Sequence, residues 1–312
     1  MSYLPHDDAI RILERWTDGT SPRLLGQGME GTVYAVDRNR VAKIWFDESE
    51  ASLQRLQCFC NALAANSFRF EIPRILEIHR VEGRCVTIEQ RLVGTSLADL
   101  LETGHTGLDE ARSTLVDALA ELAGSGAVPA ARTLPVMDES APLYEGSEDF
   151  SNALADVAER RLARFRRTLD SAVEELDKKV VALRARLHEV DSRRRSVIHG
   201  DLIPGNILIG EARTPTAVLD WGFFTTEGDP AFDGAVAASI FDMYGDGALN
   251  TELDLYAQLE DRLGYERETL LVYRAAYSLI TANAYDADGN DGHFAWCADA
   301  LNRPDVVDAL LA

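Results

Sequence analysis

The sequence is short of cysteines and of basic residues, and each shortage excludes a class of protein. Its four cysteines, Cys58, Cys60, Cys85 and Cys297, form no Cys-x-x-Cys pair, so the pattern indicates neither a zinc site nor a disulfide framework. Only 31 lysines and arginines accompany 52 acidic residues, and the formal net charge is −21. Such a charge repels nucleic acids and anionic membranes and argues against both as partners.

A long hydrophobic run is also missing. No run of about 18 apolar residues is present that could span a bilayer, and His6, Asp7 and Asp8 stand where a secretory signal would need a basic end and an apolar core. We therefore expect a cytoplasmic protein. The 312 residues suffice for two domains or one large bilobed domain, because single cores stop growing near ~250–300 residues.

Lysine is absent from the last 93 residues, where 18 acidic residues accompany four arginines. This excess is typical of a solubilising surface and is also compatible with a cationic ligand. In this acidic region, residues 286–291 read DADGND, which resembles the start of an EF-hand calcium loop. An EF-hand is excluded because Asp291 stands at the sixth position instead of glycine, and Cys297 stands at the twelfth instead of glutamate. A surface loop is the plainer interpretation, and a cation-binding rim of a substrate site is the alternative.

The N-terminal part of the chain has the pattern of a small sheet with one main helix. Residues 23–36 and 40–46 are rich in β-branched and aromatic residues and predict two strands of an antiparallel hairpin. Residues 47–66 have an amphipathic helical pattern, and residues 72–81 and 84–93 predict a second hairpin. The order predicts an antiparallel sheet followed by a mostly helical region.

Beyond this sheet the chain is mostly helical in pattern. Residues 109–123 and 152–195 favour helix nearly throughout, while 124–149 is rich in glycine, proline and serine and predicts a long irregular connection. A short strand at 217–221 and three or four closing helices are expected after it. The second part is therefore predicted to be larger and mostly helical.

Gly26, Gly28 and Gly31 form a G-x-G-x-x-G pattern, which alone fits a dinucleotide-binding turn, a kinase-type glycine loop or a simple tight loop. The residues after Gly31 favour the kinase type. A dinucleotide-binding turn opens a helix, whereas Gly31 runs into a predicted strand and Lys43 lies on the next one. A glycine-rich hairpin over phosphates, with a lysine on the adjacent strand, is the kinase arrangement. A P-loop is excluded because no G-K-[ST] is present.

The stretch VIHGDLIPGNILIG, residues 197–210, places three polar side chains in an otherwise apolar run. Unpartnered burial would cost about 1–3 kcal/mol for each polar group, so His199, Asp201 and Asn206 either cap a turn or perform chemistry. Asp201 can accept a proton from a substrate hydroxyl, and Asn206 can offer its amide oxygen to magnesium. Asp220, at the end of a predicted strand, can supply a second oxygen ligand.

These motifs, taken together, resemble the aminoglycoside phosphotransferase and choline kinase-like group of kinase-fold enzymes. The resemblance is carried by HGDLIPGNIL, LDWG, EGDPAFD, the glycine loop, Lys43 and IEQRLVGTSL, and it extends from Leu24 to Asp233. It implies an α+β, bilobal protein kinase-like fold, with a small antiparallel sheet and one main helix in the N-lobe and a larger, mostly helical C-lobe. The implied boundaries are 1–93 for nucleotide binding and 94–312 for catalysis and substrate, with 105–195 shaping the acceptor site.

The resemblance also implies a role for each motif residue. Asp201 would be the catalytic base, with His199 orienting its loop through the backbone near Asp220, and Asn206 and Asp220 would bind Mg2+. The nucleotide contacts would come from the glycine loop and its neighbours. Gly26, Gly28 and Gly31 would lie over the phosphates, and Lys43 would contact the α- and β-phosphates. The nucleobase would be covered by Val33 and Ala42, and its purine ring would meet the backbone from Gln90 to Leu92. Asp229 and Asp233 would be structural, capping and bracing the loop after the metal site.

Two residues depart from the pattern of the group. Kinase-fold proteins pair the strand lysine with a glutamate inside the first helix, but no acid lies between Glu50 and Glu71. Either Glu50 serves as the partner of Lys43 or Gln57 replaces it as a neutral partner. The second departure is Ile203, because the group often has histidine there and protein kinases have lysine.

The function predicted from these motifs is the magnesium-dependent transfer of the γ-phosphate of ATP or GTP to a hydroxyl of a small, cationic acceptor. An antibiotic of the aminoglycoside, macrolide or nucleoside type is the first expectation, which would make the protein a resistance enzyme. A metabolic kinase for choline, homoserine, a fructosamine or a sugar is the alternative, followed by a catalytically silent nucleotide-binding module. A protein kinase fits less well, because GDP follows LDWG within seven residues and leaves no room for a peptide-binding activation segment. A monomer or homodimer is expected.

Overall fold

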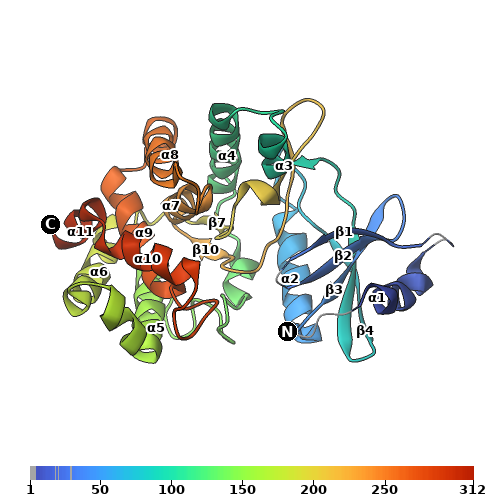
Figure 1. Cartoon of the computed structure of the whole chain (residues 1–312), viewed down its shortest axis with the longest axis horizontal. Helices are drawn as coiled ribbons and strands as arrows, with labels where there is room; N and C mark the ends of the chain where they lie inside the picture. Colours follow the sequence, from blue (N-terminus) through green and yellow to red (C-terminus); the bar gives the residue numbers. More distant parts are fainter. Residues whose placement is uncertain (1–4, 18, 20, 29) are drawn as a thin grey trace. The chain divides into compact units, whose positions relative to one another are not determined.

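The computed structural model describes residues 5–17, 19, 21–28 and 30–312, and contacts between residues divide the chain into two compact units (Figure 1). Unit 1 comprises Met1–Ser96 and Ile207–Leu219, and unit 2 comprises Leu97–Asn206 and Asp220–Ala312. The contacts assign residues 207–219 to unit 1, whereas the sequence predicts continuous lobes. The predicted division of nucleotide binding and catalysis between the lobes stays a prediction.

Unit 1 is built on a five-stranded antiparallel sheet in the order β1-β2-β3-β5-β4. The strands β6, β8 and β9 form a separate three-stranded sheet. The elements of unit 1 in its described residues are α1 (His6–Leu13), the 3-10 turn η1 (Glu14–Trp16), β1 (Arg23–Gln27), β2 (Gly31–Ala35), β3 (Arg40–Trp45), α2 (Glu50–Leu63), β4 (Ile75–Val81), β5 (Arg84–Gln90), β6 (Thr95–Ser96), β8 (Ile207–Ile209) and β9 (Pro215–Val218).

The predicted strand at 23–36 forms two strands, β1 and β2, because the chain reverses direction between Gln27 and Gly31. The two strands pair antiparallel, with Gln27 opposite Thr32. The second strand of the prediction forms β3, which pairs with β2 as expected. The glycine-rich segment therefore lies at the turn of a hairpin, as the kinase-type arrangement requires.

Different helices cover the two faces of this sheet, because side chains alternate along each strand. On β3, Ala42 and Ile44 pack in a core cluster with Ile12 of α1. Trp45 packs in a second cluster with Leu53 of α2. Figure 1 shows α1 and α2 on the two sides of the sheet. Residues 40–45 therefore alternate between the α1 face and the α2 face.

Unit 2 is mostly helical, with one short antiparallel pair of strands, β7 and β10. Its described elements are α3 (Leu97–Glu102), α4 (Leu108–Ala123), the 3-10 turn η2 (Pro129–Thr133), α5 (Phe150–Ala172), α6 (Leu176–Val190), β7 (Ser196–Ile198), the 3-10 turn η3 (Pro204–Asn206), β10 (Thr226–Gly228), α7 (Pro230–Ile240), α8 (Ala248–Leu263), α9 (Arg267–Thr281), α10 (Gly292–Asn302) and α11 (Pro304–Leu311).

Two helices, α7 and α9, form the core of unit 2. Every residue of α7 is buried, and α9 packs against α5, α6, α7, α8, α10 and α11. A helix that is apolar on all sides is expected in such a central position. The region 152–195, predicted to be helical nearly throughout, forms the two helices α5 and α6, because the chain breaks between them at Glu175, which has a left-handed backbone with φ of 47°.

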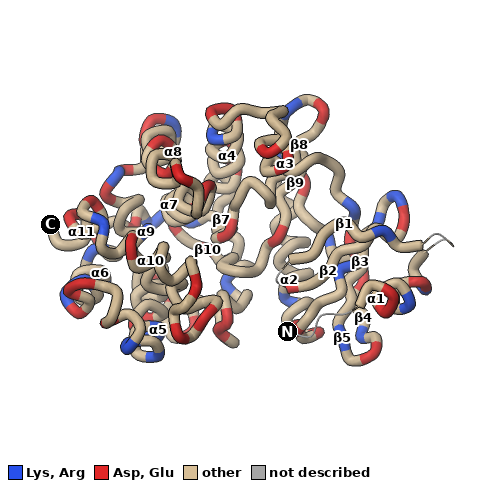
Figure 2. The backbone as a smooth tube through the Cα atoms, viewed as in Figure 1, with Lys and Arg blue, Asp and Glu red and all other residues tan. Residues whose placement is uncertain are grey.

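Charged residues of both signs are spread over the loops and helices of each unit (Figure 2). Part of the C-terminal acid excess is internal, because Glu252 is 4% exposed and its carboxylate accepts hydrogen bonds from Arg303 at 2.9 and 3.0 Å. The excess is therefore not only a solubilising surface. No helix among the described residues is long and apolar enough to cross a membrane.

Candidate functional site

The three glycines of the loop in unit 1 differ in what surrounds them. A Cβ atom at Gly31 would meet the carbonyl oxygen of Ile44 at 2.4 Å, so the packing of β2 on β3 requires glycine there. At Gly26 and Gly28 a Cβ would meet nothing within 4 Å. The backbone at these two positions is open to a close approach, which is what a phosphate-binding loop needs. Met29 lies outside the described residues.

Lys43 and Val33 share one face of the sheet, because they are directly opposite each other on β3 and β2. Ala42 points to the other face, where it is fully buried in the cluster with α1. This position does not fit the predicted contact between Ala42 and a base bound on the Lys43 side. Val41 alternates onto the Lys43 face and is the residue we now expect there.

The structure places an acid on Lys43 that the sequence prediction missed. The Lys43 Nζ lies 3.0 Å from Glu30 Oε2 and 3.7 Å from the centre of the Trp45 ring. Of the two predicted partners, Gln57 donates its amide to the carbonyl of Ile75 at 2.9 Å, and Glu50 is exposed at the first residue of α2. The kinase pattern predicts an acid of the helix as the partner, whereas Glu30 belongs to the glycine loop.

The segment expected to face the purine, Gln90 to Leu92, begins at the last residue of β5. The backbone N–H of Gln90 donates to the carbonyl of Arg74 at 2.9 Å, and that of Arg91 donates to Asn39 at 2.8 Å. These two donors are used within unit 1. We therefore expect a backbone N–H bond to a base to come from Leu92, which is partly exposed in the connection after β5.

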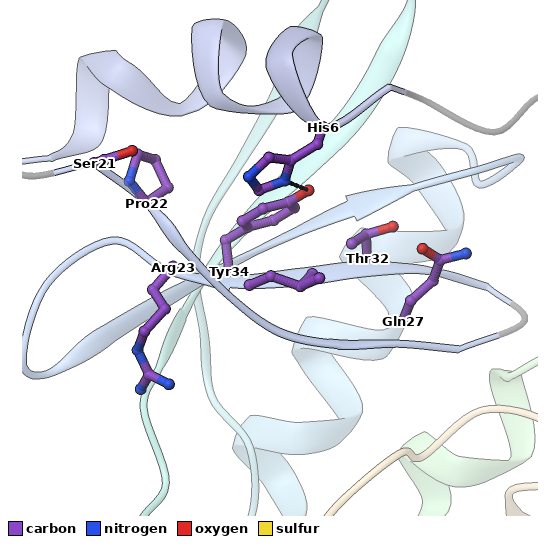
Figure 3. A pocket seen from close by; sticks show the side chains of 8 residues that line it. His6, Ser21, Pro22, Arg23, Gln27, Thr32 and Tyr34 are labelled. Carbon is purple, nitrogen blue, oxygen red and sulfur yellow. Dashed lines mark hydrogen bonds between the residues drawn. The ribbon is translucent and has the colours of Figure 1, made fainter.

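Unit 1 also contains a cavity of about 600 Å³, and Figure 3 shows its lining side chains. Tyr34 and Thr32 contribute to it from β2, and His6 of α1 stacks on Tyr34 with a 3.2 Å hydrogen bond to its hydroxyl. Tyr34 belongs to the core cluster of the α1 face, so this cavity lies on the side of the sheet opposite to Lys43. It is not the predicted nucleotide site.

In unit 2, the loop after β7 holds the predicted base. His199 is fully buried, and its Nδ1 accepts a hydrogen bond from the backbone N–H of Asp201 at 3.2 Å. Gly200 has φ of 74°, and a Cβ there would meet the carbonyl oxygen of Phe224 at 2.6 Å. Only glycine fits this left-handed, crowded position. The Asp201 side chain is partly exposed, as a group that receives a substrate proton must be.

Asn206 closes the same loop from η3. Its Nδ2 donates to the carbonyl of Asp201 at 2.8 Å, and two backbone bonds through Ile203, each 2.9 Å long, link the two residues as well. Donation by Nδ2 leaves Oδ1 of Asn206 as the oxygen that can bind a metal. The apolar Ile203 contributes backbone bonds to the loop, and nothing in the structure explains why its side chain is apolar.

Asp220 follows β9 with an exposed carboxylate and a left-handed backbone, φ 61°. The next residue, Trp221, packs its ring 4.4 Å from that of His199. Thr225 links the same two segments, since its Oγ1 accepts from Gly222 N at 2.9 Å and donates to the carbonyl of His199 at 3.1 Å. The loops that carry Asp201 and Asp220 are thus tied together within unit 2.

Asp233 has a structural role, but its target differs from the predicted one. Its buried carboxylate accepts hydrogen bonds from the backbone N–H groups of His199 at 3.0 Å and Gly200 at 2.8 Å. It therefore braces the loop that carries Asp201, not the loop after Asp220. Full burial raises the pKa of Asp233 to about 6. Asp229 caps α7 through Ala231 N at 3.0 Å, in agreement with the predicted capping role.

A comparison with known protein families identifies the chain. A model of the phosphotransferase enzyme family matches residues 21–270, which include the glycine loop, Lys43 and the segments around Asp201 and Asp220. The chain belongs to this family. None of the curated proteins matches its sequence. The chain is therefore a small-molecule phosphotransferase that uses a hydroxyl as acceptor.

Solved structures show the fold of this phosphotransferase. A gentamicin complex of APH(2")-IIa is 14% identical, covers 97% of this chain and 100% of its own, and gives a TM-score of 0.60. The aminoglycoside phosphotransferase APH(3'')-Id from Streptomyces rimosus, with ADP and streptomycin, is 17% identical over 89% and 99%, with a TM-score of 0.57. The macrolide 2'-phosphotransferase MphH from Brachybacterium faecium is 20% identical over 96% and 99%, with a TM-score of 0.53. The predicted kinase-like fold is confirmed.

The phosphotransferase also has an aromatic pair that the sequence prediction missed. Phe223 and Tyr285 stack with ring centres 6.0 Å apart at 13°, and Met137 N donates to the carbonyl of Phe223 at 2.6 Å. Burial and the nearby Asp201 carboxylate raise the pKa of the Tyr285 hydroxyl. Asp291 caps α10 through Phe294 N, while its Oδ2 is buried without a partner among the described residues. Of these residues, Asp291 alone had a sequence signal, the DADGND stretch.

Proposed function

We propose that this phosphotransferase transfers the γ-phosphate of ATP or GTP to a hydroxyl of a small cationic acceptor, and that the acceptor is an antibiotic of the aminoglycoside, macrolide or nucleoside type. The observation that carries the proposal is the closed loop from His199 to Asn206 in a member of the phosphotransferase family. The fold neighbours support the acceptor class, because they include complexes with gentamicin and streptomycin and a macrolide 2'-phosphotransferase.

Asp201 is the proposed base of unit 2. The oxygen of the acceptor hydroxyl forms a bond to the γ-phosphorus, the bond from that phosphorus to the bridging oxygen breaks, and the nucleoside diphosphate leaves with the electron pair. The proton of the hydroxyl passes to the Asp201 carboxylate. The bonds of Asn206 and His199 to the backbone of Asp201 hold that carboxylate in one place. Positioning of this kind supplies much of the rate.

Asn206 and Asp220 fit a magnesium ion that is held largely by phosphates and water. Their oxygens are the hard ligands that Mg2+ prefers, and one or two protein ligands are usual for it. No group of three His, Cys, Asp or Glu side chains gathers as a metal site within the described ranges. When bound, the ion would neutralise charge on the phosphates.

In unit 1, Lys43 is the proposed ligand of the α- and β-phosphates. Gly26 and Gly28 offer open backbone to the phosphates, Val33 and Val41 flank Lys43 on its face of the sheet, and the purine meets the backbone from Gln90 to Leu92. The ADP in the complex of the Streptomyces rimosus neighbour supports a nucleotide co-substrate.

Lys43→Met is expected to raise the Kd for the nucleotide at least about tenfold, because a charge-assisted contact is lost and the Glu30 carboxylate is left facing phosphates. Isothermal titration with a non-hydrolysable ATP analogue and magnesium measures the change. Lys178→Met is the matched control, because Lys178 is an exposed lysine of α6. An unchanged Kd in Lys43→Met would remove Lys43 from the nucleotide site.

Asp291 is the proposed partner of a cationic group of the acceptor, because its buried Oδ2 needs a donor. Asp291→Asn keeps an oxygen for the cap on Phe294 N but loses the charge. We expect the KM for a cationic acceptor to rise about tenfold with kcat nearly unchanged. Asp288→Asn, an exposed change in the same loop, is the control. Equal KM values in both variants would contradict the assignment.

Transfer itself is tested with a panel of hydroxylated antibiotics and metabolites, each incubated with magnesium and ATP or GTP. Mass spectrometry of the acceptor detects the gain of one phosphoryl group. A thermal-shift screen selects the acceptors first, since a ligand of the folded state raises the Tm. Phosphorylation of an antibiotic supports the proposal. Phosphorylation of choline, homoserine, a fructosamine or a sugar alone would replace it with a metabolic kinase.

A further inference from the structure

Helix α2 offers little to hold the lysine of the proposed nucleotide site. Its one acid, Glu50, is the first residue of the helix and is exposed. Gln57, one to two turns further on, donates its side chain to the carbonyl of Ile75. Kinase-fold proteins are expected to use an acid of this helix to orient the strand lysine. An acid of another element, Glu30, contacts Lys43 instead.

Glu30 meets the requirements for that partner. Its Oε2 lies 3.0 Å from Lys43 Nζ, and the Lys43 side chain is only 14% exposed, so the ion pair is partly shielded from water. The ammonium also lies 3.7 Å from the centre of the Trp45 ring, and the Trp45 indole is fixed by a 3.0 Å bond to Thr87 Oγ1. Glu30 and Trp45 together hold the end of Lys43 at one position on the α2 face of the sheet.

The backbone of Glu30 is fixed to the sheet, not carried on the tip of the loop. Its carbonyl accepts a hydrogen bond from Phe46 N at 2.8 Å, just beyond the end of β3. The next residue, Gly31, begins β2 opposite Trp45, where a Cβ would meet the Ile44 carbonyl oxygen at 2.4 Å. The hairpin and β3 are therefore locked together at the level of Glu30, and a carboxylate so anchored can orient its neighbour.

We propose that Glu30 is the positioning residue of Lys43 and takes the place of the missing helix acid. The inference rests on the proposed nucleotide-binding role of Lys43. Its consequence is that the orientation of the lysine is coupled to the glycine loop itself, so that the loop and Lys43 act as one element. A displacement of helix α2 would leave the lysine in place, whereas a displacement of the glycine loop at Glu30 would move it.

A double-mutant cycle tests the proposal, because a residue that acts through Lys43 loses its effect once Lys43 is removed. The variants are Glu30→Gln, Glu30→Asp, Lys43→Ala and Glu30→Gln with Lys43→Ala, and Glu50→Gln is the matched control on α2. We expect Glu30→Gln to lower kcat about tenfold, Glu30→Asp to recover part of the loss, and Glu50→Gln to match the wild type. In the Lys43→Ala background, Glu30→Gln should change kcat less than about twofold.

The other outcomes are equally informative. A Glu30→Gln variant that binds nucleotide more tightly and turns over faster would make Glu30 a competitor of the phosphates and would overturn the proposal. An effect of the same size in both backgrounds would make Glu30 a structural residue, which a fall in Tm would accompany. Loss of activity in Glu50→Gln with none in Glu30→Gln would return the role to the helix. If the wild type binds no nucleotide, the proposed function fails too; in every other case it stands independently.

Discussion

Replacing Asp201 by asparagine is expected to lower kcat by about 10³-fold while nucleotide binding persists. A positioned general base contributes on the order of 10²–10⁴-fold to the rate, and asparagine cannot accept the proton. The loop should keep its shape, because the contacts of Asp201 with His199 and Asn206 involve its backbone N–H and carbonyl, which the substitution retains. Transfer assays give kcat, and isothermal titration gives the nucleotide Kd.

Asp299→Asn is the control for this prediction, because Asp299 is an exposed acid of α10 in the same unit. It should behave as the wild type in both assays. Undiminished turnover in Asp201→Asn would remove Asp201 as the base. A loss of nucleotide binding or of Tm that parallels the loss of transfer would show that the side chain stabilises the loop instead of reacting with the acceptor.

Replacing Asp233 by alanine is expected to lower the free energy of unfolding by about 4 kcal/mol. The carboxylate accepts from the backbone N–H groups of His199 and Gly200, and each buried donor left without a partner costs about 1–3 kcal/mol. A cavity adds to the loss. Denaturant unfolding measures the change, with Asp246→Ala in the exposed connection between α7 and α8 as the control. A loss no larger than in the control would contradict the bracing role.

The same carboxyl produces a dependence of stability on pH. Burial raises the pKa of Asp233 from its ordinary 3.8 to about 6. Between these two values the folded protein keeps a proton that the unfolded chain has lost, so its contribution to stability is greatest below pH ~4 and falls as the pH rises to ~6. The Asp233→Ala variant should lack this part of the pH dependence. An identical pH profile in both proteins would show that the pKa of Asp233 is the same in the folded protein and in the unfolded chain.

The residues of the proposed acceptor side differ in whether a sequence pattern could identify them. The DADGND stretch predicts a surface loop, with a substrate rim as the alternative, and the rim stays a prediction. In this stretch the structure shows that Oδ2 of Asp291 is buried without a hydrogen-bond partner among the described residues. The aromatic pair of Phe223 and Tyr285 had no signal at all, because the two residues are distant in sequence and meet only through the folding of unit 2. In a sequence, a single aromatic residue is interpreted as part of the core. Only the contact between their rings shows that Phe223 and Tyr285 form a pair.

The sequence by itself determined the features that depend on short distances along the chain. The segment from His199 to Asn206 suffices for a tight loop, since its own hydrogen bonds close it. The three glycines ahead of Lys43 suffice for a hairpin next to a strand. The family follows from these local patterns. The period of two along β3 also separates Ala42 from Lys43, so the face of Ala42 was readable from the sequence as well.

Only the tertiary structure decided which residues support these motifs. Asp233 of α7 accepts a hydrogen bond from the backbone of His199, which follows β7. Glu30, just before β2, contacts Lys43 on the neighbouring strand β3. A carboxylate looks the same in a sequence whether it lies on a helix, in a loop or in a core. Its partner is chosen by the register of the strands and the packing of the helices, and no spacing along the chain expresses either of them.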